Sequence, residues 1–140
     1  MLTEQRLAIE REAEKVLLRF FHHLDADEFE ALAALMAEDG VWHRQGKLLR
    51  GPGMVLEAMA ARPKGRRTRH LITNLVLDAV DERHVQAIYY LTAFRYDGAT
   101  PGEPAPIELP ASVGTYREKL VLTPAGWRVA EITSEGAFRR

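Results

Sequence analysis

The sequence has no cysteine among its 140 residues. A thiol nucleophile, a zinc site built on cysteine and a disulfide framework are therefore excluded. No apolar run approaches the roughly 18 residues that a transmembrane helix requires. The N-terminal stretch MLTEQRLAIEREAEK is charged where a secretory signal peptide would be apolar. We therefore expect a cytoplasmic protein that has no membrane contact.

An excess of charge of either sign is also lacking. Lys and Arg together number 19, Asp and Glu number 20, and the formal net charge is -1, so the chain offers nucleic acid no positive field. None of the five histidines has the H-E-x-x-H spacing of zinc enzymes, and the G-x-S-x-G and G-x-G-x-x-G patterns are missing. We expect no metal, no other cofactor and no nucleic-acid partner.

The chain has the size and composition of one folded domain. Hydrophobic residues make up 46% of it and charged residues 28%, which is ordinary for a globular protein. A chain of this length buries about 68% of the surface that its unfolded form exposes, so its core needs no metal or disulfide. A single domain over residues 1–140 is predicted.

The first third of the chain has the apolar period of helices. In residues 4–24, with Thr3 as the expected N-cap, apolar side chains recur at spacings of three and four: Ile9, Ala13, Val16, Phe20 and Leu24. The stretch DADEFEALAALMAEDG repeats the pattern, with Asp27 and Glu30 as a capping box and Gly40 as the stop. A third, short helix is predicted in GPGMVLEAMAAR, where Pro52 stands near the start.

The rest of the chain is typical of strands. VWHRQGKLLRG predicts a short hairpin around Gln45 and Gly46. Four longer segments rich in Val, Ile, Leu and Tyr follow, and because short links join them in pairs, each pair must be antiparallel. These segments cover residues 68–80, 84–96, 111–123 and 126–134. Helices followed by a meander of strands predict an α+β fold, in which a curved antiparallel sheet wraps around the N-terminal helices and encloses a pocket.

The loop between the two strand pairs, residues 97–110, contains four prolines and two glycines. A loop of this length is usually functional or mobile. Another connection, RPKGRRTRH, carries five Lys or Arg in residues 62–69. Such a run is usually a solvated loop, and recognition of an anionic substrate or partner is the alternative.

The stretch RRTRHLITNLVLD raises the question of function. Alternation in a strand puts His70, Ile72 and Asn74 on one face and three leucines on the other: Leu71, Leu75 and Leu77. The face with His70 either meets water or lines a polar cavity. A lone histidine at a strand end is more often half exposed than catalytic, but the polar Asn74 on the same face favours the cavity.

Two further charged residues are candidates for chemistry. Asp25 precedes Asp27, which fits the capping role better, so Asp25 is free to point inward from the end of a helix. A carboxylate beside an imidazole fixes its tautomer and stabilises the imidazolium, as abstraction of a proton by histidine requires. Arg95 ends a strand and is either a solvated cation or, if it faces the pocket, a group that stabilises a developing anion.

The chain resembles the SnoaL-like branch of the nuclear transport factor 2-like superfamily. The residues that carry the resemblance are LDADEFEALAALMAEDGVW at 24–42, RTRHLITNLVLD at 67–78 and YREKLVLTPAGWRVAEIT at 116–133. The resemblance implies an α+β cone with a deep apolar pocket. Within the superfamily the chain is similar to the scytalone dehydratase and hexachlorocyclohexane dehydrochlorinase types, which implies elimination by a His-Asp pair without a cofactor.

The motifs of these types place the pair at His70 and Asp25, and a pocket residue at Trp42. Arg95 stands where scytalone dehydratases have a second histidine, and Leu24 where they have a tyrosine. We therefore expect a lyase that acts on a small, largely apolar cyclic or aromatic molecule. The predicted catalytic residues are His70, Asp25 and Arg95, and the predicted substrate-binding residues are Trp42, Tyr89, Tyr116, Asn74, Ile72 and Met54.

The same family leaves alternatives open. An isomerase or cyclase would use the same base, and the fold also hosts non-catalytic binding or assembly subunits akin to the small subunit of ring-hydroxylating dioxygenases. A leucine-rich outer sheet face, with Leu71, Leu75 and Leu77, predicts self-association as a homodimer, and a homotrimer is the alternative because the two dehydratase-like types are trimers.

Overall fold

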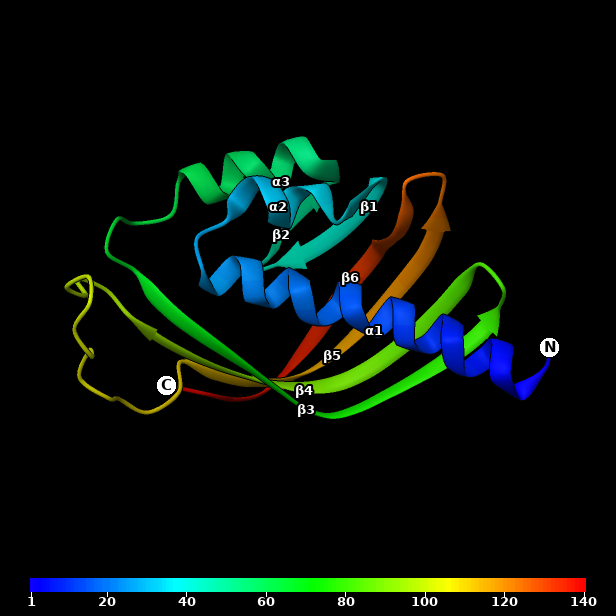
Figure 1. Ribbon diagram of the computed structural model, residues 1–140. Helices are drawn as coiled ribbons and strands as arrows, with labels where there is room; N and C mark the ends of the chain where they lie inside the picture. The colour runs from blue at the N-terminus through cyan, green and yellow to red at the C-terminus, as the bar shows by residue number, and fades with distance from the viewer.

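Six strands form one curved sheet that does not close, and the helices lie on its concave side (Figure 1). The structure, a computed structural model, describes residues 1–140. Its elements are α1 (Thr3–Asp25), α2 (Phe29–Ala34), β1 (Met36–Arg44), β2 (Lys47–Arg50), α3 (Gly51–Ala60), β3 (Arg67–Asp81), β4 (His84–Tyr96), β5 (Ser112–Thr123) and β6 (Gly126–Arg139). The predicted α+β class is confirmed. None of the helices combines the length and the apolar composition needed to cross a bilayer.

The strand order is β2-β1-β6-β5-β4-β3, and every pair but one is antiparallel. The exception is β1 with β6, which run parallel, with Trp42 opposite Ile132. The expectation of a purely antiparallel sheet is wrong at this pair. The first strand and the last are distant in sequence, so no short link forces them to run in opposite directions.

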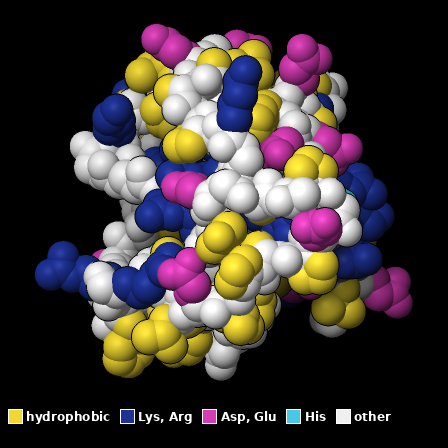
Figure 2. All heavy atoms as spheres, turned by 90° about the vertical axis from the view of Figure 1, so that its left-hand side faces the viewer, with side chains coloured by type: hydrophobic (Ala, Val, Ile, Leu, Met, Phe, Trp, Pro, Cys, Tyr) yellow, Lys and Arg dark blue, Asp and Glu magenta, His cyan; other side chains and the backbone are white.

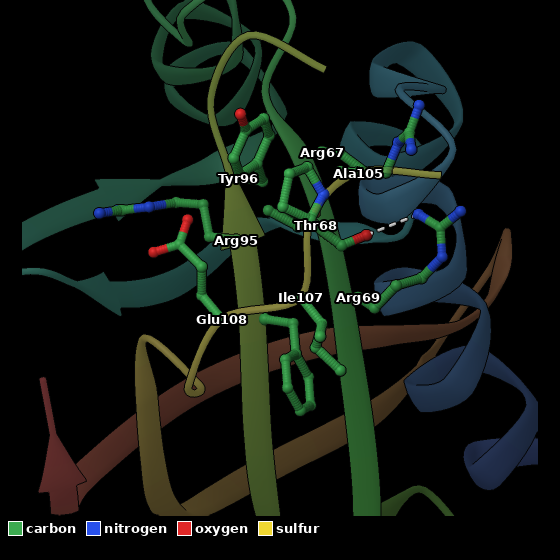
Figure 3. A pocket seen from close by; sticks show the side chains of 10 residues that line it. Arg67, Thr68, Arg69, Arg95, Tyr96, Ala105, Ile107 and Glu108 are labelled. Atoms are coloured by element: carbon green, nitrogen blue, oxygen red, sulfur yellow. Dashed lines mark hydrogen bonds between the residues drawn. The ribbon is translucent and has the colours of Figure 1, made fainter. Parts of the chain in front are cut away.

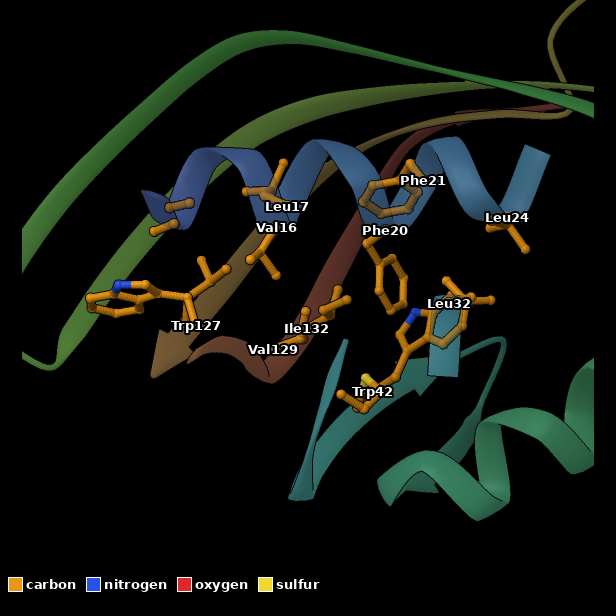
Figure 4. Close-up of a cluster of buried hydrophobic side chains, with 14 of the residues drawn as sticks. Val16, Leu17, Phe20, Phe21, Leu24, Leu32, Trp42, Trp127, Val129 and Ile132 are labelled. Atoms are coloured by element: carbon orange, nitrogen blue, oxygen red, sulfur yellow. The ribbon is translucent and has the colours of Figure 1, made fainter. Parts of the chain in front are cut away.

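The core lies between α1 and the sheet (Figure 4). The predicted apolar stripe of α1 is buried from Ala13 onward, with Ile9 partly buried, and the rings of Phe20 and Trp42 meet edge to face with centroids 5.0 Å apart. Thr3 is the first residue of the helix and not its cap, which is Leu2. Burying side chains of this size stabilises the fold by about 1.5–3 kcal/mol each. This packing fixes where the C-terminal end of α1 lies against β3.

The second predicted helix is much shorter than its pattern suggested. α2 ends at Ala34, and Met36 already begins β1, where it is buried beside β6. Gly40 does not stop a helix; a Cβ there would lie 2.5 Å from the carbonyl oxygen of Val129. Asp27 adopts φ 58 and makes no capping bond. Pairing with β6 overrides the helical preference of these residues.

A β-bulge in β3 changes the predicted faces of that strand. Thr73 pairs with Tyr90 and Val76 with Ile88, so β3 holds one residue more than β4 in this interval. Asn74, with φ 54, lies in this interval, and asparagine tolerates the left-handed region well. From here the alternation reverses, and Leu75 packs against the core.

The predicted outer face is therefore wrong in part. Leu75 and Leu77 point inward and pack on the core, while Leu71 is 45% exposed on the outer face as expected. Asn74 is exposed and does not share the face of His70. The residues that keep that face are those before the bulge: Thr68, His70 and Ile72.

Candidate active site

The C-terminal end of α1 meets the N-terminal part of β3. Asp25 is the last residue of α1, and its Oδ1 lies 2.6 Å from Nδ1 of His70. Its Oδ2 accepts a hydrogen bond of 2.8 Å from the backbone N–H of His70. The Thr68 hydroxyl donates to Oδ1 at 2.8 Å. Three donors from one strand therefore hold a carboxylate at the negative end of a helix dipole, where a carboxylate is otherwise unfavourable.

Arg62 extends this network by one more bond. Its guanidinium donates to the Thr68 hydroxyl oxygen at 2.8 Å, and its side chain is only 6% exposed. Because Arg62 occupies a lone pair of that oxygen, the hydroxyl proton is directed at Asp25. Thr68 could have been found from the sequence, since it lies two residues before His70 on the same face. Arg62 could not, because nothing distinguishes it within its basic run.

The carboxyl of Asp25 is kept ionised. Burial would raise its pKa, but the hydrogen bond and charge of His70, with the further bonds from the His70 backbone and Thr68, lower the pKa below its usual value. An ionised carboxylate only accepts, so Nδ1 of His70 carries the proton. In the neutral imidazole this leaves the other ring nitrogen, Nε2, with its lone pair unprotonated.

His70 forms part of the wall of a cavity of about 290 Å³. Aromatic side chains make up much of its apolar wall, among them Phe21, Trp42 and Tyr116. The ring of Phe21 lies 5.6 Å from that of His70 between centroids. The polar wall contains several arginines. Figure 2 views the end of the molecule that lies on the left in Figure 1, and Lys and Arg side chains gather near the middle of that face. The His70 and Asp25 pair thus adjoins a cavity with aromatic and cationic walls.

The family model of the SnoaL-like domain matches residues 5–133. The chain belongs to the SnoaL-like family. The resemblance predicted from the three sequence stretches is thereby confirmed. A comparison with curated proteins finds no match.

Several solved structures share this fold. A candidate scytalone dehydratase from Novosphingobium aromaticivorans is 21% identical and superposes with a TM-score of 0.77 over 98% of this chain and 89% of that one. A type 2 hexachlorocyclohexane dehydrochlorinase, LinA, is 16% identical, with a TM-score of 0.78 over 98% and 90%. An NTF2-like protein with a cystatin-like fold, also from Novosphingobium aromaticivorans, is 21% identical, with a TM-score of 0.72 over 94% and 84%. Identities this low establish a shared fold and not a shared reaction.

In this SnoaL-like chain the predicted site residues fall into two groups. The cavity brings together His70, Trp42, Tyr116 and Arg95, with Asp25 directly behind His70. The other four predicted residues do not line it: Met54, Ile72, Asn74 and Tyr89.

Each of these four side chains lies outside the cavity for a different reason. Met54 points out of α3 and is 41% exposed. Ile72 packs against the core, and Asn74 is turned outward by the bulge. Tyr89 is completely buried beneath the cavity, with its ring stacked on Tyr116 at 5.6 Å between centroids. These four side chains do not line the cavity of His70, so a substrate bound there does not meet them in this geometry.

The loop 97–110 has no regular structure, as expected, and it borders a second hollow (Figure 3). Arg67 anchors the loop by donating to the carbonyl oxygens of Glu103 and Thr100 at 2.6 and 3.0 Å. Ile107 and Glu108 of the loop form part of this hollow, and Arg95 lies between it and the cavity of His70. No three His, Asp or Glu side chains come together as metal ligands, and no metal site is assigned.

Below the cavity, Tyr89 donates a hydrogen bond of 2.7 Å to Oε1 of the buried Glu118. The other carboxyl oxygen of Glu118 is buried without a partner. Burial raises the pKa of Glu118 to about 8, although the bond from Tyr89 acts in the opposite direction. Burial and the Glu118 carboxyl together raise the pKa of Tyr89 well above its ordinary value. Glu118 is therefore neutral in the folded protein at neutral pH.

This carboxyl should make the protein less stable as the pH rises. In the unfolded chain Glu118 loses its proton near its ordinary pKa of 4.5, and in the folded protein near 8. Between these values only the folded state holds the proton, so the free energy of unfolding falls by up to about 1.4 kcal/mol per pH unit. We expect Glu118→Gln, which keeps an acceptor for Tyr89, to flatten this slope when Tm is measured from pH 5 to 8.

The matched control is Glu135→Gln on the exposed end of β6, which should leave the slope unchanged. An equal slope in wild type and Glu118→Gln would show that Glu118 does not keep its proton.

Proposed function

We propose that the protein is a cofactor-independent lyase that carries out a dehydratase-like elimination on a small cyclic or aromatic substrate. The observation that carries the proposal is the 2.6 Å contact between Asp25 and His70 at the wall of an open cavity. His70 and Asp25 are 13% and 15% exposed, so the pair is largely shielded from water. The family membership and the dehydratase and dehydrochlorinase folds of its neighbours support the proposal.

In the proposed reaction, Nε2 of His70 takes a proton from a carbon next to an activating group. The electron pair of that C–H bond forms the new double bond, and the bond to the leaving hydroxyl breaks. The imidazolium then returns the proton to the hydroxyl, which leaves as water. Asp25 keeps the tautomer and balances the imidazolium charge. The Tyr116 hydroxyl and the Arg95 guanidinium are the proposed stabilisers of negative charge on oxygen.

Tyr116 and Tyr89 have different proposed roles, because only Tyr116 lines the cavity. Tyr116 lines the cavity, and its pKa is raised by burial, with the nearby Ser134 and Arg44 partly offsetting that effect. It is therefore a neutral donor that can point at a substrate oxygen. Tyr89, predicted as an alternative donor, is engaged by Glu118 and takes no part.

The proposal is tested with a panel of cyclic β-hydroxy ketones and β-hydroxy acids incubated with the protein in D2O. NMR spectra record both the loss of water and the exchange of the proton next to the carbonyl. Elimination from any member supports the lyase, whereas exchange with migration of a double bond would indicate an isomerase with the same base. A protein that neither eliminates nor exchanges protons on any member would favour the non-catalytic binding subunit.

We also propose a homodimer formed through the outer face of the sheet. Large apolar side chains on this face are exposed: Leu71, Val76, Tyr90 and Phe138. Light scattering should give the mass of a dimer for wild type and that of a monomer for Leu71→Lys. The control is Leu48→Lys on β2, a position of nearly equal exposure, 43% against 45%. A trimeric mass, or a dimer that Leu71→Lys leaves intact, would contradict the proposed interface.

A further inference from the structure

Among Lys, Arg, Asp and Glu, only positively charged side chains line the cavity of His70. Four arginines line it: Arg44, Arg62, Arg66 and Arg95. None of its lining residues is Asp or Glu. The chain as a whole has a net charge of -1, so the surplus of positive charge is local. Guanidinium groups that face one space repel one another and lose hydration, and both costs are reduced when an anion enters.

Two of these arginines are paired with nearby carboxylates. Arg66 makes a two-pronged contact with Asp97, at 2.8 and 3.0 Å. Arg62 lies 4.0 Å from Asp27 and uses another nitrogen for the Thr68 hydroxyl. Their charges therefore have a partner in the protein.

Arg44 has no such partner. Its guanidinium makes no hydrogen bond and no ion pair, and lies over the ring of Trp42 at 5.2 Å from the centroid. Its pKa is lowered by burial and by the charges of Arg62 and Arg66. All of its N–H donors are free, and stacking on the indole restricts its plane. Such a planar fork matches a carboxylate.

The positions of Arg44 and His70 define the ligand further. Arg44 ends β1, the second strand from one edge of the sheet, and His70 lies near the start of β3, the strand at the opposite edge. The aromatic side chains of Trp42, Phe21 and Tyr116 belong to the same cavity wall. A ring against these side chains can present an anionic group to Arg44 and a carbon atom to His70.

We propose that the substrate is a cyclic or aromatic carboxylic acid whose carboxylate binds the Arg44 guanidinium. The inference deepens the proposed function by naming the substrate class, and it rests on that function for the statement that the bound acid reacts. Arg95 has no ion pair either, but it is exposed and also borders the second hollow, so the half-buried Arg44 is the better defined site for the carboxylate. The inference also makes the expected substrate more specific, since a largely apolar molecule without an anionic group would leave the charge of Arg44 unmatched.

Binding of 2-naphthoate and 2-naphthamide by isothermal titration calorimetry tests the inference. The two probes have the same shape and differ in charge. We expect wild type to bind the acid at least about tenfold more tightly than the amide, which corresponds to about 1.4 kcal/mol. Arg44→Gln should remove the preference and Arg44→Lys should retain part of it. Arg117→Gln, the same change on the exposed outer face of β5, should preserve it.

Equal affinities for acid and amide in wild type would overturn the inference, as would a preference that survives in Arg44→Gln. A preference for 2-naphthyl phosphate over 2-naphthoate would overturn the choice of a carboxylate. Turnover is not a readout here, so the two proposals fail separately. If the protein prefers the acid but catalyses no elimination, the carboxylate site stands and the lyase proposal fails. If it eliminates water from neutral substrates and shows no preference for the acid, the lyase proposal stands and the carboxylate site fails.

Discussion

A His70→Gln variant should fold normally and lose its elimination activity by about 10²- to 10⁴-fold, the usual contribution of a positioned general base. Glutamine retains an N–H that can meet Asp25, so the buried carboxylate keeps a donor. It lacks a nitrogen that can accept a proton at neutral pH. The rate of water loss, measured on any substrate that wild type converts, is the readout. Tm measured in parallel reports the fold.

A second His-Asp pair in the same chain provides a matched control. Nδ1 of His84 lies 2.9 Å from Oδ1 of Asp81 at the turn between β3 and β4, and both side chains are 56% exposed. This pair has the same bond but no cavity. His84→Gln should therefore leave the rate unchanged. A rate in His70→Gln within threefold of wild type would remove His70 from the mechanism, even if the fold and the cavity are as described.

Comparison of the two pairs shows what spacing in a sequence can reveal. The pair of His84 and Asp81 is close in the sequence and is formed by a turn. The pair of His70 and Asp25 joins residues 45 positions apart, and only the packing of α1 on the sheet brings them together. The sequence singled out Asp25 because it had no capping role, and His70 because Asn74 was expected on the same strand face, which the bulge shows to be wrong. Their mutual contact was implied by the resemblance and not by the pattern.

The alternation of β3 was predictable only as far as the bulge. From Thr68 to Ile72 the side chains alternate between the two faces of the sheet as predicted, so the side on which His70 lies is correct. A bulge at Asn74 adds one residue, and nothing in LITNLVLD requires it, because apolar residues follow on both faces, Leu75 and Leu77 on one and Val76 on the other. The faces of Leu75 and Leu77 were therefore exchanged, and with them part of the predicted outer surface.

The boundary between α2 and β1 also could not be predicted from local sequence. ALAALMAED has residues that favour helix, and local preference alone predicts a continuous helix. The chain becomes a strand at Met36 because β6, almost 100 residues later, offers a free edge. The same docking brings Trp42 and Arg44 to the cavity. The electrostatic character of the site therefore depends on a long-range pairing that sequence patterns do not contain.

Replacing Asp25 by asparagine should reduce the elimination rate as strongly as replacing His70, by up to about 10⁴-fold, the loss measured when a triad aspartate becomes asparagine in a serine protease. The carboxylate uses both oxygens, Oδ1 for the His70 ring and the Thr68 hydroxyl, and Oδ2 for the His70 backbone N–H. An amide has one oxygen to offer, and its NH₂ group must face one of these donors.

Both orientations of the asparagine damage the site. If its oxygen faces the backbone N–H of His70, its NH₂ faces Nδ1, which must then accept. The ring proton moves to Nε2, and the nitrogen at the cavity can no longer take a proton from a substrate. If its oxygen faces Nδ1, the NH₂ opposes the backbone N–H, and a nearly buried donor loses its partner at a cost of about 1–3 kcal/mol. In the first orientation the Thr68 hydroxyl also loses its acceptor, so we expect a lower Tm in both cases, and the position of the His70 ring proton distinguishes them.

Nitrogen NMR of the imidazole distinguishes the two states directly, because protonated and unprotonated ring nitrogens have well-separated shifts. In wild type we expect the proton of neutral His70 on Nδ1, and in Asp25→Asn on Nε2 if the first orientation holds. Asp81→Asn, the same substitution in the exposed pair, should alter neither the His70 tautomer nor the rate. If Asp25→Asn keeps the proton on Nδ1 and most of the activity, Asp25 only fastens α1 to β3, and His70 works without a carboxylate partner.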